Sequence, residues 1–198
     1  SEIVTQLLYG ESADIIDVSN NWTRIRTHYD NYEAWMDTKQ ITAVSDEYLA
    51  SRKTNLIQES FQSTMLESGR TLLSMGSEVT FETSSPTRGQ DLSESIVNCA
   101  KEFLNVPYLW GGKSFFGIDC SGFTQIIYKI HGIKIPRDTY QQAGLGEVLT
   151  FIEEAKPGDL AFFENSEGRI IHVGFILADQ KIIHAHGKVR IDSLDSTG

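Results

Sequence analysis

The sequence predicts an α+β protein in two parts, a small β-barrel followed by a domain in which a cysteine-bearing helix packs on an antiparallel sheet. Short strand-like segments at about ten-residue spacing fill residues 3–41. Helical periodicity then begins near residue 91 and gives way to strands after residue 159. The chain has 198 residues, 40% apolar and 22% charged, which is typical of one or two globular units.

The charge balance excludes two classes of partner. A net charge of −10 leaves no obvious basic face with which to bind nucleic acid or an anionic membrane. The longest apolar runs are far shorter than the roughly 20 residues that span a bilayer, so we expect no membrane insertion. The sequence favours no particular oligomeric state.

Four N-terminal segments are predicted to be strands, and turn residues separate them: 3–8, 13–18, 22–27 and 32–37. Trp22, Ile25 and Trp35 are the candidate inward side chains of a small barrel. A polar helical stretch follows near residues 46–53. We place the barrel at residues 1–75 and a linker at residues 76–90.

The C-terminal part, residues 91–198, opens with a helical stripe. Its apolar residues recur at three- and four-residue steps: Leu92, Ile96, Cys99 and Phe103. Cys99 lies on this stripe and is expected to be a packed core thiol. The other cysteine, Cys120, stands in a different local context, so we expect two free thiols.

A second helix is predicted from Cys120 to Ile130, with Asp119 as its N-cap and Gly132 as its left-handed C-terminal cap. Its buried face comprises Phe123, Ile126, Ile127 and Ile130. A short helix is expected to begin near Asp138. Four strands are expected to follow, at residues 160–164, 169–177, 181–185 and 189–191.

Cys120 is the candidate nucleophile. A thiol in the first turn of a helix feels the positive end of the helix dipole, which favours the thiolate. Ser121 and Gly122 add little bulk beside it, and the backbone N–H of Cys120 can point at a developing oxyanion.

A thiol nucleophile needs a base, and His172 lies within an apolar strand. If residues 178–180 form the turn of a hairpin, position 172 lies opposite 186 and diagonal to 184. Either His184 or His186 could then orient His172, which would complete a triad. A zinc site built from these residues is the alternative, but their spacings match no common zinc pattern, and we expect neither metal nor cofactor.

Six motifs occur in order along residues 92–192: 107–112 (PYLWGG), 119–123 (DCSGF), 136–139 (PRDT), 157–163 (PGDLAFF), 172–174 (HVG) and 183–185 (IHA). They closely resemble the motifs of the NlpC-type endopeptidases, papain-like cysteine peptidases that cut bacterial cell-wall peptides. Residues 5–11, 22–26 and 32–35 resemble the bacterial SH3-like modules of cell-wall enzymes. Such modules usually carry one more strand before this point, so we expect a barrel clipped at its N-terminal end.

The resemblance implies the catalytic roles. Cys120 would be the nucleophile, His172 the base and His184 the orienting residue, and the Tyr108 hydroxyl would help to stabilise the oxyanion.

The resemblance also implies a set of substrate-binding residues. Asp119 and Ser121 would meet the N-terminal end of the substrate, and Thr139 would add a hydroxyl where relatives often have serine. Glu11 and Tyr32 are the candidates for a wall, contributed by the first domain, that blocks longer N-terminal extensions.

The implied reaction is hydrolysis of the bond between γ-D-glutamate and the following diamino acid in peptidoglycan-derived peptides with a free N-terminal L-alanine. A papain-like amidase or acyltransferase is one alternative. A non-catalytic cell-wall-binding protein is another, against which the intact cysteine and histidines argue. Two free thiols and no visible leader favour the cytoplasm, and a periplasmic or secreted location is the alternative if a leader was removed.

Overall fold

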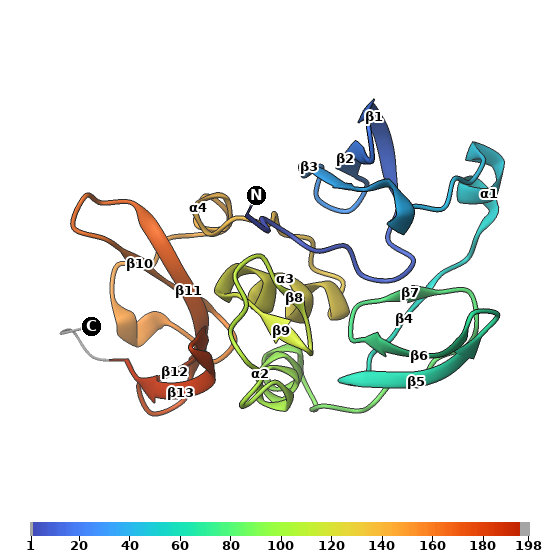
Figure 1. The fold of residues 1–198 in the computed structure, drawn as a ribbon. Coiled ribbons are helices and arrows are strands. Elements are labelled where there is room, and N and C mark those ends of the chain that lie inside the picture. Colours follow the sequence, from blue (N-terminus) through green and yellow to red (C-terminus); the bar gives the residue numbers. More distant parts are fainter. Residues whose placement is uncertain (1, 195–198) are drawn as a thin grey trace.

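The computed structural model describes residues 2–194 and has the α+β architecture that the sequence predicts (Figure 1). Strands β1 (Ala13–Ser19), β2 (Trp22–Thr27) and β3 (Glu33–Asp37) form an antiparallel sheet in that order. After it come η1 (Thr38–Gln40), α1 (Asp46–Ser51) and two strand pairs, β4 (Asn55–Leu56) with β7 (Glu78–Val79) and β5 (Phe61–Leu66) with β6 (Gly69–Ser74). Strand pairing therefore reaches into the segment expected to be a linker.

The C-terminal part places helices against one antiparallel sheet. The first elements are α2 (Leu92–Glu102), β8 (Lys113–Ser114), β9 (Gly117–Ile118), α3 (Cys120–Ile130), α4 (Thr139–Gln142) and η2 (Ile152–Glu154). The sheet then runs in the order β10 (Leu160–Glu164), β11 (Ile170–Leu177), β12 (Lys181–His186) and β13 (Lys188–Ser193). Helices α2 and α3 lie between this sheet and the N-terminal strands (Figure 1).

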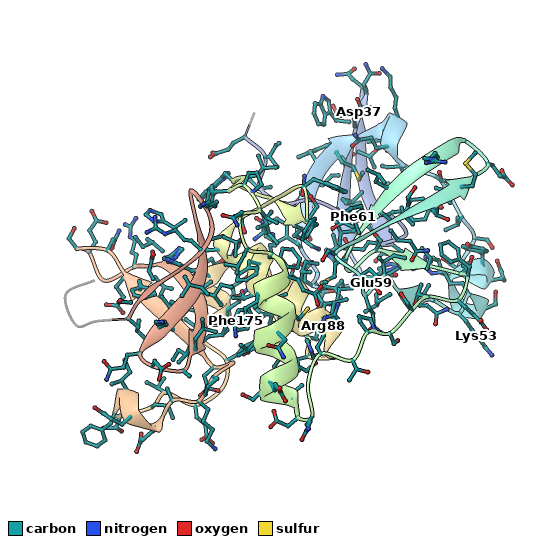
Figure 2. The ribbon with its side chains drawn as sticks, turned by 90° about the horizontal axis from the view of Figure 1, so that it is seen from below. Asp37, Lys53, Glu59, Phe61, Arg88 and Phe175 are labelled. Carbon is teal, nitrogen blue, oxygen red and sulfur yellow. The ribbon has the colours of Figure 1, made fainter. Side chains whose placement is uncertain are left out.

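The core lies where α3 packs on the sheet. Phe123 of α3 is fully buried, and its ring meets Phe175 of β11 edge-on, with the ring centroids 5.5 Å apart. Phe103, just after α2, meets the other side of Phe123 at 5.6 Å. Cys99 is fully buried in the same cluster, as the helical stripe predicts. Figure 2 labels Phe175 on the C-terminal sheet. This stacking fixes the start of α3 against the middle of the sheet.

Helix α3 has the predicted bounds and the predicted cap. Asp119 is its N-cap, and Gly132 follows the last turn with φ of 74°, the left-handed conformation that glycine tolerates best. Of the stripe predicted on α2, Leu92 is exposed, and it is the first residue of the helix.

Two predictions for the N-terminal part were wrong. Trp22 and Trp35 are 48% and 46% exposed, whereas Ile25 is buried. Side chains alternate along a strand, so Trp22, three residues before Ile25, lies on the opposite face, and Trp35 pairs with the exposed Arg24. Residues 3–8 form no strand, because this segment instead runs along the C-terminal part and bonds to it.

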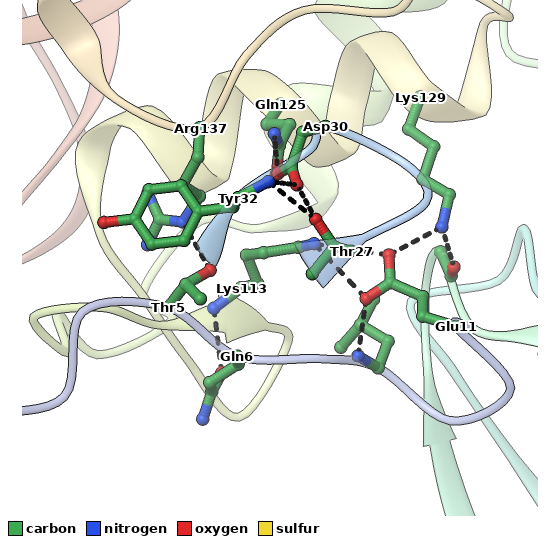
Figure 3. Close-up of polar contacts among 12 residues, drawn as sticks. Thr5, Gln6, Glu11, Thr27, Asp30, Tyr32, Lys113, Gln125, Lys129 and Arg137 are labelled. Atoms are coloured by element: carbon green, nitrogen blue, oxygen red, sulfur yellow. Dashed lines mark hydrogen bonds and ion pairs between the residues drawn. The ribbon is translucent and has the colours of Figure 1, made fainter. Parts of the chain in front are cut away.

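Polar contacts join the N-terminal part to the C-terminal part (Figure 3). Thr5 accepts a hydrogen bond from Arg137 at 3.0 Å, and Gln6 accepts one from the backbone N–H of Lys113 at 2.8 Å. The side chain of Gln125 on α3 donates to Asp30, in the turn between β2 and β3, at 2.9 Å. The two parts therefore share one polar interface that borders the first turns of α3.

Within residues 2–194, no helix combines the length and the apolar character needed to cross a bilayer.

Candidate active site

Cys120 begins α3, and the residues around it fix its position. The Asp119 side chain accepts a hydrogen bond from the backbone N–H of Gly122 at 2.7 Å, which caps the helix. A side chain at Gly122 would collide with the carbonyl oxygen of Gly112, so only glycine allows the loop to pass this close. Glycine at position 122 therefore does more than keep the surroundings of the thiol small. It also allows the loop that precedes β8 to approach α3 closely.

A buried ion pair lies beneath the start of the helix. Arg137 is 1% exposed and holds both oxygens of Asp119, at 3.0 Å and 2.6 Å. The backbone N–H of Gly111 adds a hydrogen bond at 2.9 Å, and Ser121 accepts one from Arg137 at 2.8 Å. The carboxylate of Asp119 is thus neutralised and fully bonded within the protein, so its geometry is that of a support for the helix start and not of a free anion facing a ligand.

The Cys120 thiol is buried, with 6% of the residue exposed. Burial and the nearby Asp119 carboxylate raise its pKa, although the Thr139 hydroxyl, 3.9 Å from Sγ, and the backbone N–H of Val173 act in the opposite direction. The dipole of the helix alone predicted a thiolate. In the structure burial acts against this effect and raises the pKa of the thiol.

The structure therefore places Thr139, the first residue of α4, beside the thiol. Val173 is the residue after His172 on β11, so the same contact places Cys120 beside the strand that carries the expected base.

His172 is held from two sides. Its Nε2 lies 2.7 Å from Nδ1 of His184, and its ring centroid is 5.8 Å from that of Phe163. Burial, together with His184 and His186, lowers the pKa of His172 to about 4. The imidazole is therefore neutral at neutral pH, and its Nδ1 is the nitrogen that the contact with His184 leaves available to accept a proton.

The hairpin that carries the histidines has the register expected from its turn. Gly174 pairs with His184, and this register continued by two residues sets position 172 opposite 186. Of the two candidates for the orienting residue, His184 makes the hydrogen bond. His186 is exposed, and its ring centroid lies 6.1 Å from that of His172. Gly174 makes room for this arrangement, because a Cβ there would lie 2.7 Å from Cβ of His184.

Tyr108 lies beside the thiol. It is half-buried, and burial together with the nearby Cys120 and Asp119 raises its pKa to about 12. The phenol therefore stays protonated at neutral pH and can donate a hydrogen bond. A bridge between Tyr108 and Ile118, just before Asp119, holds it at the start of α3.

Of the two residues expected to form a pocket wall, Tyr32 lies near the PRDT motif, whereas Glu11 lies in a separate buried cluster. Tyr32 lies near Arg137 (Figure 3). Burial and the Asp138 carboxylate raise the pKa of Tyr32. Glu11 is buried elsewhere, and its carboxylate binds Lys113 at 3.2 Å and Lys129 at 2.8 Å. The expectation that Glu11 forms part of a pocket wall is therefore corrected, because two buried ammonium groups already bind this carboxylate.

Sequence reasoning missed two residues of the PRDT motif. Arg137 is the partner of Asp119, and Asp138 is a half-buried carboxylate that forms no ion pair within residues 2–194. Burial raises the pKa of Asp138. The motif carries part of the family resemblance, but only the fold shows that its arginine is buried and that its aspartate lies beside Tyr32.

A cysteine at a helix start and a strand histidine oriented by a second histidine define a papain-like cysteine peptidase. The sequence profile of the NlpC/P60 family matches residues 105–198, and that of the bacterial dipeptidyl-peptidase SH3 domain matches residues 1–41. The chain belongs to the NlpC/P60 family.

Relatives match the whole chain. It is 31% identical to the gamma-D-glutamyl-L-lysine dipeptidyl-peptidase of Bacillus cereus in an alignment 243 positions long, which covers 100% of this chain and 72% of that protein. It is 28% identical to dipeptidyl-peptidase 6 of Lysinibacillus sphaericus, with 98% of this chain and 85% of that protein covered. The crystal structure of an NlpC/P60 family protein from Bacillus cereus superposes with a TM-score of 0.85 at 27% identity, covering 98% of this chain and 78% of that one. The predicted SH3-like and papain-like parts are thereby confirmed.

Proposed function

We propose that the protein hydrolyses the bond between γ-D-glutamate and the following diamino acid in peptidoglycan stem peptides. The observation that carries the chemistry is the hydrogen bond between His172 and His184 on the strands beside the buried thiol of Cys120. The choice of bond is supported by the relative named a gamma-D-glutamyl-L-lysine dipeptidyl-peptidase, which the whole chain matches.

In the first half of the reaction, the Cys120 sulfur attacks the γ-carbonyl carbon of D-glutamate while its proton passes to Nδ1 of His172. The negative charge that develops on the carbonyl oxygen is met by the backbone N–H of Cys120 and the Tyr108 hydroxyl. The carbon–nitrogen bond then breaks as His172 returns its proton to the leaving amine. A thioester remains on Cys120.

In the second half, His172 takes a proton from water, and the resulting hydroxide attacks the thioester carbonyl. The carbon–sulfur bond breaks, the thiolate recovers the proton from His172, and the L-alanyl-D-glutamate unit leaves. The neutral resting state of His172 suits this cycle, because each half of the reaction begins with a neutral imidazole that accepts a proton.

We propose that the peptide's free N-terminal ammonium group binds Asp138, with Tyr32 closing the pocket beyond it. Asp119 and Glu11 are neutralised by buried cations, whereas Asp138 forms no ion pair within the described residues. An ammonium group beside a half-buried carboxylate forms a charge-assisted hydrogen bond. Cleavage after two residues would follow from this anchoring, which suits peptide fragments of peptidoglycan such as murein tri- and tetrapeptides.

The test uses L-Ala-γ-D-Glu-L-Lys, its meso-diaminopimelate counterpart, and N-acetylated copies of both. The wild type is expected to cleave only the free-amine peptides. Asp138→Asn should lower kcat/KM on them by about tenfold or more, mainly through KM. Asp179→Asn, in the exposed turn between β11 and β12, is the matched control. Equal cleavage of the acetylated peptides would rule out amine anchoring, and no cleavage of any peptide would rule out the proposed bond.

One observation favours a second candidate, acyl transfer to a lipid or other apolar acceptor. The segment between α4 and β10 exposes several large apolar side chains: Leu145, Val148, Leu149, Phe151 and Ile152. Such a patch would suit an apolar acceptor. Mass spectrometry of the products distinguishes the two, since transfer yields an acylated acceptor and hydrolysis yields the free acid.

A further inference from the structure

The orienting histidine has a carboxylate partner of its own. Nε2 of His184 lies 2.9 Å from Oδ2 of Asp192 on β13. Arg190 holds the other oxygen of Asp192 with Nε at 2.9 Å and Nη2 at 2.7 Å. The register pairs His184 with Arg190 and Ile182 with Asp192, so Asp192 lies diagonal to His184 on the same face of the sheet.

We propose that Asp192 is a positioning residue for the peptidase reaction, and that it acts by fixing which nitrogen of His184 carries the proton. This inference rests on the proposed function. It extends the Cys120, His172 and His184 set by one residue, which works through His184 and touches no substrate.

The argument follows the direction of the hydrogen bonds. A neutral imidazole has one N–H, and an ionised carboxylate can only accept. The proton of His184 therefore lies on Nε2 and points at Asp192. Nδ1 of His184 is then an acceptor, so Nε2 of His172 must be the donor across the 2.7 Å contact. With its proton on Nε2, neutral His172 has a lone pair on Nδ1, where the thiol proton has to go.

The opposite arrangement would be inactive. If His184 carried its proton on Nδ1, it would donate to Nε2 of His172, and neutral His172 would then hold its own proton on Nδ1. That nitrogen could no longer accept the proton of Cys120. Because the two tautomers of an imidazole are close in energy, a fixed acceptor at Nε2 of His184 is needed to select the active one.

Asp192 is suited to this task because it stays ionised. Although its slight burial acts in the other direction, the hydrogen bonds from His184 and Arg190 lower its pKa. When His172 becomes an imidazolium during the reaction, its Nε2–H bond to His184 is already in place. No proton has to move, and no ring has to rotate, in the hydrogen-bonded series from His172 through His184 to Asp192.

Asp192→Asn is the first variant, because the amide keeps the shape but not the charge. We expect kcat to fall roughly 10- to 100-fold while KM changes less than about twofold. Asp179→Asn should leave both constants at the wild-type values. Asp192→Glu retains a carboxylate and is expected to recover most of kcat, which separates the effect of charge from a folding defect.

Two readouts distinguish positioning from a structural role. His184→Gln and the double variant His184→Gln/Asp192→Asn should have the same kcat, because Asp192 acts only through His184. Nitrogen-15 NMR of histidines in Cys120→Ala should show His184 protonated on Nε2, and a shift toward Nδ1 when Asp192→Asn is added. The NMR result needs no substrate, so it stands or falls separately from the proposed reaction.

Additive losses in the double variant would overturn the proposal. So would a wild-type kcat for Asp192→Asn, or a His184 tautomer that Asp192→Asn leaves unchanged.

Discussion

At the scale of single residues, the site depends on two groups that burial keeps neutral. Burial raises the pKa of the Cys120 thiol and lowers that of His172 to about 4. The sequence places both side chains but does not show how deeply each is buried, so it does not predict that burial raises the pKa of the thiol. The charge separation that attack requires is formed in the reaction itself, next to the donors that stabilise it.

The depressed pKa of His172 makes a prediction about stability and pH. As the pH falls, His172 becomes protonated in the unfolded chain near pH 6.5, whereas in the folded protein it becomes protonated only near pH 4. The stabilisation from neutral His172 is thus present above pH 6.5 and is lost as the pH falls toward about 4. Urea unfolding at several pH values should show a smaller loss over this window for His172→Gln than for wild type. Parallel pH curves for the two proteins would contradict the assignment.

At the scale of elements, the first turn of α3 rests on the Arg137–Asp119 pair. Arg137→Met should leave the Asp119 charge buried and unpaired, at a cost of about 3–5 kcal/mol in the free energy of unfolding. Arg24→Met is the matched control, because the Arg24 side chain is 44% exposed in its pair with Glu33, and we expect about 0–1 kcal/mol. Denaturant unfolding measures both. Equal effects of the two variants would show that the buried pair does not hold α3 in place.

The elements differ in how well the sequence predicts them. Cys120–Ile130 and Leu160–Glu164 were predicted with the observed bounds, because each has a clear period and a turn signal at its end. Strands β4 to β7 were not predicted. β4 and β7 have two residues each, and β5 exposes its apolar Phe61 and Met65, so no clear apolar alternation marks these strands in the sequence.

At the scale of the whole molecule, buried charges join the two parts. Lys129 on α3 binds Glu11 at 2.8 Å and Glu78 at 3.2 Å, and Lys113 binds Glu11 at 3.2 Å. Glu11 precedes these lysines by 102 and 118 residues, so no local sequence pattern predicts the contact. For this reason the sequence predicts a pocket position for Glu11 instead. Charge alone does not tell a pocket carboxylate from an interface carboxylate.

Glu11→Gln is expected to weaken this interface strongly. It removes the carboxylate from two buried ammonium groups, which should lower the free energy of unfolding by about 3–5 kcal/mol. Glu33→Gln, on the exposed surface, should change the free energy of unfolding far less, because solvent screens the Glu33 pair. Urea denaturation compares the two, and limited proteolysis reports whether the N-terminal part separates first. If Glu11→Gln were as stable as Glu33→Gln, the buried cluster of Glu11, Lys113 and Lys129 would not be what holds the two parts together.

The central claim is that Cys120 is the nucleophile, and the second thiol of the chain supplies its control. Cys99 is fully buried, and burial raises its pKa to about 12. The decisive measurement is kcat/KM on L-Ala-γ-D-Glu-L-Lys for Cys120→Ala and Cys99→Ala. We predict a loss of roughly 10³-fold or more for Cys120→Ala and a change within a few-fold for Cys99→Ala. Near-normal turnover by Cys120→Ala would contradict the account.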